Sequence, residues 1–129
     1  MNTAKALMIG FLAATATIIV AARIPKTMAL EFLFAILVAI TFVYFGFVLI
    51  DGRIREMFFE FGNIALTLTL AFLGLWAAPY WLAAGYFIHG VWDAIHHPGG
   101  IRTKIPRWYI PFCLLFDWLV SGFIIIWWR

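Results

Sequence analysis

Apolar residues form five long runs along the chain, and short segments rich in charged residues, proline or glycine separate them. A transmembrane helix needs about 20 mostly apolar residues, because it rises about 1.5 Å per residue across a hydrocarbon layer about 30 Å thick. Each run approaches or meets that length. The pattern therefore predicts an all-α, polytopic membrane bundle of about five transmembrane helices, at residues 6–22, 28–50, 61–78, 80–97 and 108–128.

The third and fourth runs adjoin each other, and Pro79 interrupts the apolar stretch between them. As one helix, residues 61–97 would measure about 55 Å, which is far more than the hydrocarbon core. We therefore expect a tight hairpin at residues 77–80. The remaining linkers are too short to hold a soluble module, so we predict a single transmembrane domain over residues 1–129.

Composition also favours a lipid environment. Of the 129 residues, 66% are hydrophobic and only 12% are charged, whereas about a quarter of a soluble domain is charged. The net charge of +3 rests on nine Lys and Arg residues, all of them outside the predicted spans, which favours contact with anionic lipid headgroups and argues against a nucleic-acid partner. Cys113 is the only cysteine, so neither an intrachain disulfide nor a cysteine-rich metal site is expected.

The basic residues also predict the orientation of the chain, because cytoplasmic loops carry an excess of Lys and Arg. With the N-terminus in the cytoplasm, six basic residues lie inside and three lie outside. We therefore expect a multi-pass protein of the cell (inner) membrane, with its N-terminus cytoplasmic and its C-terminus outside. The inner set is Lys5, Arg53, Arg55, Arg102, Lys104 and Arg107, and the outer set is Arg23, Lys26 and Arg129.

The polar residues inside the spans are concentrated in one place, because all three histidines lie within nine residues of the fourth run. At about 100° per residue, His89, Asp93 and His96 fall on one helix face, and His97 flanks it. His89 and Asp117 each lie about 13 Å from the predicted inner boundary, on adjacent antiparallel helices. We therefore expect them to meet near the middle of the membrane.

An ionised carboxyl at that depth costs about 3 kcal/mol, and no Lys or Arg lies within a predicted span. Asp93 and Asp117 must therefore be protonated, paired with a histidine, or bound to a cation. Imidazoles and carboxylates are suitable ligands for zinc, and also for iron. The candidate metal ligands are His89, Asp93, His96, His97 and Asp117, and Asp93 and Asp117 are also the candidate catalytic carboxylates.

Two further acids, Glu56 and Glu60, precede or begin the predicted third helix. We expect them to face lipid headgroups near Arg53 and Arg55. The alternative is that Glu60, with Asn63, completes a site at the level of His96 and His97.

The motif His-Gly-x-Trp-Asp-x-x-His-His at 89–97, with Pro106, Cys113, Asp117 and a terminal Trp pair after it, resembles a group of bacterial membrane proteins. That group is the domain of unknown function 6010, and the resemblance covers residues 85–128. It implies a helical membrane fold and a shared site, but no reaction.

Two characterised families offer partial analogies. Asp93-x-x-His96-His97 is similar to the histidine box of membrane desaturases, but three histidines are too few for the two irons of those enzymes. The ceramidase-like membrane hydrolases combine three His, an Asp and a Ser around zinc in a seven-helix fold. Here the same residue types are His89, His96, His97, Asp117 and Ser121.

Three functions remain open. The first is a metal-dependent site, with zinc or iron, that acts on a lipid or another hydrophobic small molecule. The second is a proton- or ion-coupled small transporter or channel subunit, since histidine titrates near neutral pH and five helices would require a homo-oligomer. The third is a non-catalytic membrane assembly protein in which Asp–His hydrogen bonds join two helices. The sequence does not decide whether the protein is an enzyme.

Overall fold

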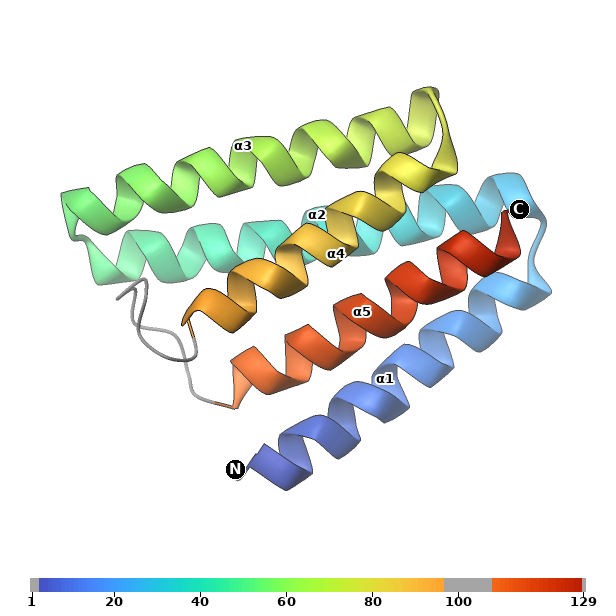
Figure 1. The fold of residues 1–129 in the computed structure, drawn as a ribbon, viewed down its shortest axis with the longest axis horizontal. Helices are drawn as coiled ribbons and strands as arrows, with labels where there is room; N and C mark the ends of the chain where they lie inside the picture. Colours follow the sequence, from blue (N-terminus) through green and yellow to red (C-terminus); the bar gives the residue numbers. More distant parts are fainter. Residues whose placement is uncertain (1–2, 97–107, 129) are drawn as a thin grey trace.

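The fold is an all-helical bundle, as the apolar runs predict (Figure 1). The computed structural model describes residues 3–96 and 108–128, except for the side chain of His96. The start of the first described helix and the end of the last lie at opposite ends of the bundle. Within the described residues there are five helices: α1 (Thr3–Arg23), α2 (Lys26–Asp51), α3 (Ile54–Trp76), α4 (Pro79–His96) and α5 (Tyr109–Trp127).

Helix α3 begins at Ile54, seven residues before the predicted start, so the predicted boundary at residue 61 is wrong. The reason lies in Gly52, which adopts a left-handed conformation (φ 73°) and ends α2 through a hydrogen bond from its N–H to the carbonyl of Val48. A glycine in this conformation reverses the chain within two residues. The residues expected to form a loop therefore form the first two turns of α3.

The predicted hairpin between the third and fourth helices is present. Helix α3 ends at Trp76, and Pro79 begins α4. Proline is well suited to this first position, because the N–H groups of the first helical turn make no hydrogen bond within the helix. The two helices are in close contact on either side of this turn. A Cβ atom added to Gly74 of α3 would overlap the Cβ and the backbone N of Leu82 of α4. Only glycine permits this approach.

Four of the described helices, α1, α2, α3 and α5, are long and apolar enough to cross a membrane. Many of their large hydrophobic side chains are exposed, as expected for contact with lipid. Helix α4 does not meet the same criterion, and it is the helix that carries the histidines. It packs mainly against α5 and α3 and also touches α2 (Figure 1). His89 and Asp93 of α4 are thus enclosed by its neighbours.

Candidate metal centre

His89, Asp93 and Asp117 meet inside the bundle. His89 and Asp93 are four residues apart on one face of α4, and Asp117 projects from α5. His89 Nδ1 lies 2.6 Å from Asp117 Oδ2 and 3.6 Å from Asp93 Oδ2. One potential ligand atom from each of the three residues lies within 4.8 Å of the other two. The side chains of both carboxylates are 0% exposed, and that of His89 is 1% exposed.

The other two predicted ligands cannot be placed in this centre. His96 is the last residue of α4, but its side chain is outside the described part of the structure. His97 lies wholly outside the described residues. Both remain predicted ligands. The described centre therefore consists of one imidazole and two carboxylates.

Tyr44 of α2 contacts both cluster residues of α4. Its hydroxyl donates a hydrogen bond to Asp93 Oδ1, and its ring lies edge-on against the imidazole of His89, with the ring centroids 4.9 Å apart. Cys113 and Tyr109 of α5 pack around Tyr44. Our sequence reasoning missed Tyr44. The available signal was a phenol in the middle of an apolar membrane helix, where the hydroxyl needs a partner.

Glu56 and Glu60 do not face lipid headgroups, so that expectation is wrong. Glu60 is fully buried and Glu56 is 7% exposed. Because α3 begins at Ile54, both acids belong to its buried face, and Glu60 Oε2 accepts a hydrogen bond of 3.0 Å from Trp92 Nε1 on α4. Trp92 immediately precedes Asp93, so Glu60 lies beside the cluster.

His89 Nε2 and Asp117 Oδ1 have no hydrogen-bond partner among the described residues. A buried polar atom without a partner costs about 1–3 kcal/mol. Helices α4 and α5 contain no Lys or Arg that would balance the two carboxylates. The cluster therefore has unused donor or acceptor capacity, and its two carboxyl groups have no Lys or Arg on α4 or α5 to pair with.

The model of one protein family matches residues 1–128, almost the whole chain; it is described as a family of unknown function, DUF6010. The chain belongs to this family. No curated protein and no solved structure matches it. The match extends well beyond the 85–128 segment in which we noted the resemblance. Because DUF6010 has no described activity, the function of this member must be argued from its own site.

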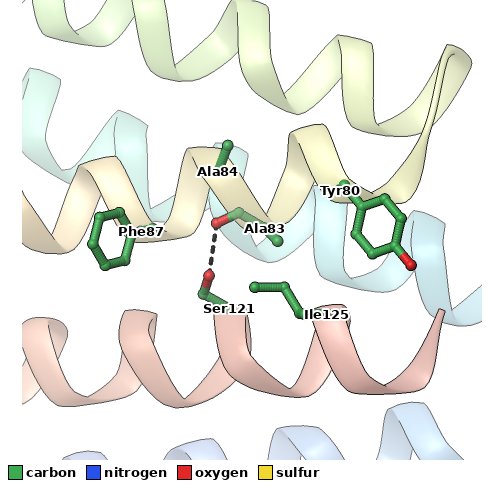
Figure 2. A pocket seen from close by; sticks show the side chains of 6 residues that line it. All are labelled: Tyr80, Ala83, Ala84, Phe87, Ser121 and Ile125. Atoms are coloured by element: carbon green, nitrogen blue, oxygen red, sulfur yellow. Dashed lines mark hydrogen bonds between the residues drawn. The ribbon is translucent and has the colours of Figure 1, made fainter. Parts of the chain in front are cut away.

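Ser121 follows Asp117 by one helical turn, but its hydroxyl is bonded elsewhere in this DUF6010 member. It donates a 2.8 Å hydrogen bond to the carbonyl of Ala83 on α4. Figure 2 shows this contact at a groove of about 430 Å³ between α4 and α5, which is also lined by Tyr80 and Phe87. Ser121 thus joins two helices, and its geometry gives no support to the ceramidase-like analogy.

Proposed function

We propose that this protein binds a divalent cation, zinc or iron, through His89, Asp93 and Asp117, and that it uses the ion to act on a lipid or another hydrophobic substrate. The observation that carries this proposal is the approach of the three ligand atoms to within 4.8 Å of one another at a fully buried position. Imidazole nitrogen and carboxylate oxygen are the ligands that zinc and non-haem iron use in proteins. His96 and His97 are proposed as additional ligands.

Charge balance is compatible with a divalent ion when both carboxylates are ionised. Two ionised carboxylates within the membrane cost about 3 kcal/mol each on insertion scales. One protonated His89 would offset one of them and leave a net charge of −1. A divalent ion with a neutral His89 would balance both carboxylates, so the bound centre would carry no net charge.

The surface beside the cluster supports a hydrophobic substrate. A groove of about 380 Å³ lies between α3 and α4, where Phe58, Leu66 and Ile88 provide an apolar wall. Trp92 also lines this groove, and it is the residue that bonds Glu60 and precedes Asp93. A lipid chain in the groove would therefore contact Trp92, which packs against the buried group that contains Tyr44. A bound metal would polarise a substrate carbonyl or activate water, with a carboxylate of the cluster as general base.

A second function, proton- or ion-coupled transport, is favoured by a different observation. Tyr44 of α2 bonds Asp93 of α4, and His89 Nδ1 bonds Asp117 of α5 and lies 3.6 Å from Asp93 Oδ2. Titratable side chains from three helices thus lie next to one another, and intramembrane groups of this kind mark proton relays in transporters. In either case we place the protein in the cell membrane, with its N-terminus cytoplasmic and its C-terminus outside.

Elemental analysis of the detergent-purified protein tests the proposal. We expect near-stoichiometric zinc or iron in the wild type, and its loss in His89→Ala and Asp93→Ala variants that retain their helical circular dichroism. Glu31→Ala is the matched control, because Glu31 is an exposed carboxylate on α2. A metal-free protein with pH-dependent flux in liposomes would favour the transport function. A protein with neither metal nor flux, whose variants lose only stability, would favour the assembly role.

A further inference from the structure

Helix α3 turns a polar face into the bundle. Glu56, Glu60, Asn63 and Thr67 are spaced by four, three and four residues, which places them on one side of a helix. All four are buried, with exposed fractions between 0% and 7%. Ionisable and polar residues inside a membrane bundle are costly and as a rule mark pathways for ions or substrates.

Two side chains on this face have polar atoms without a hydrogen-bond partner among the described residues, Asn63 Oδ1 and Thr67 Oγ1. Thr67 differs in this respect from its neighbour Thr69 and from Thr41. Each of those threonines donates a 2.8 Å hydrogen bond to the carbonyl four residues before it, which is the usual arrangement in membrane helices. The hydroxyl of Thr67 makes no such bond and is left for another partner.

The packing of α3 against α4 shows which residues of α4 lie opposite the polar face of α3. Glu60 bonds Trp92, and a Cβ on Gly85 would lie 3.4 Å from Leu70 Cβ. The two helices are antiparallel, so residues 60–70 of α3 lie opposite residues 85–92 of α4. Asn63 and Thr67 are therefore at the level of His89. From Glu56 to Thr67 the face extends about 16 Å along the helix axis.

The three cluster ligands are sealed from the surface, with side chains at most 1% exposed. A cation must therefore pass between helices to reach them. We propose that the buried polar face of α3 is the route by which a divalent cation enters the candidate metal centre, from the end of the bundle at which Gly52 joins α2 to α3. This inference rests on the proposed function. The oxygens of Glu56, Glu60, Asn63 and Thr67 replace hydration water one turn at a time along this route.

A route residue and a ligand have different kinetic effects. A ligand stabilises the bound ion, and its loss raises the Kd. A route residue lowers the barrier to passage, so its loss slows association and dissociation together and leaves the Kd unchanged. The test is stopped-flow binding of Zn²⁺ to the protein in lipid nanodiscs, followed with a fluorescent zinc indicator.

The variants are Glu60→Gln, which still accepts the Trp92 hydrogen bond, and Thr67→Val, which keeps the side-chain shape. We expect both rate constants to fall about tenfold or more, since a polar partner is worth 1–3 kcal/mol and 1.36 kcal/mol of barrier is tenfold. Glu31→Gln and Thr69→Val are the matched controls, because both side chains are exposed. Thr67→Ser, which retains a hydroxyl, should restore both rates.

Each outcome either supports or overturns the entry route along α3. Slower rates with an unchanged Kd support the route. If Glu60→Gln raises the Kd, Glu60 is a ligand and the route is overturned. If the wild type binds zinc and neither variant changes its rates, the route is overturned while the metal centre stands. If the wild type binds no zinc and elemental analysis finds neither zinc nor iron in it, both proposals fail together.

Discussion

Replacing Asp117 with asparagine preserves the shape of the side chain and removes one of the two negative charges of the cluster. Asp117 is the member contributed by α5, and its Oδ2 lies 2.6 Å from His89 Nδ1. Its side chain is 0% exposed, so no bulk water replaces the lost charge. Truncating one partner of a buried, hydrogen-bonded charged group costs about 2–5 kcal/mol. At 1.4 kcal/mol per tenfold, this predicts a Kd for zinc that rises roughly 30-fold to 4,000-fold.

The assay is competition for Zn²⁺ between the protein in nanodiscs and a chelator of known affinity. The matched control is Glu31→Gln, which removes a carboxylate on α2, 13 residues and so about 20 Å along the helix from Tyr44. We expect the control to bind zinc like the wild type. Circular dichroism separates a lost ligand from a lost fold. A folded Asp117→Asn protein that binds zinc as tightly as the wild type would refute Asp117 as a ligand.

Three further variants test the surroundings of the centre. Tyr44→Phe removes the hydroxyl that supports a ligand carboxylate, and the zinc Kd, measured by the same competition, should rise about 10-fold to 100-fold. Gly74→Ala forces a methyl group against the backbone of Leu82 and should destabilise the bundle by about 1–3 kcal/mol in a denaturant titration; Gly122→Ala, at an open position, should have no comparable effect. Ser121→Ala should cost about 0.6 kcal/mol in the same titration and leave zinc binding unchanged; a loss of zinc would place Ser121 in the centre after all.

The meeting of His89 and Asp117 was predictable because it depends only on regular geometry. A helix rises by a fixed amount per residue, and two helices adjacent in sequence are antiparallel across a membrane. Counting residues from the predicted boundary therefore gave similar depths for the two side chains. The same reasoning predicted the hairpin at Pro79, because one continuous helix would have been too long for the bilayer.

The start of α3 was not predictable in the same way. Hydropathy places the start of a transmembrane helix after the last charged residue, so Arg55, Glu56 and Glu60 were assigned to the preceding loop. The structure shows that one left-handed glycine, Gly52, completes the turn, and the charged residues then continue as helix. Hydropathy measures the cost of exposing a side chain to lipid, and it cannot recognise acids that face other helices.

Tyr44 was missed because its role depends on a contact between helices that are not adjacent in sequence. The spacing of residues within α2 shows which of them share a face, but it does not show which helix that face meets. Helix α2 contacts both α3 and α4, and α3 contacts α4. Contacts of this kind require the structure.

The fold and the candidate centre depend on each other. Helix α4, as far as it is described, is too polar to qualify as a membrane span by composition, yet its His89 and Asp93 are buried and are bonded to polar groups of α5 and α2. A single Asp–His pair would be enough to join two helices. The bundle instead gathers acids from three helices, with Glu60 bonded to Trp92. His89 and Asp117 each have an atom without a hydrogen-bond partner in the part of the chain that the structure describes. Helix joining alone does not require this many acidic groups, whereas the proposed cation site would give each of them a role.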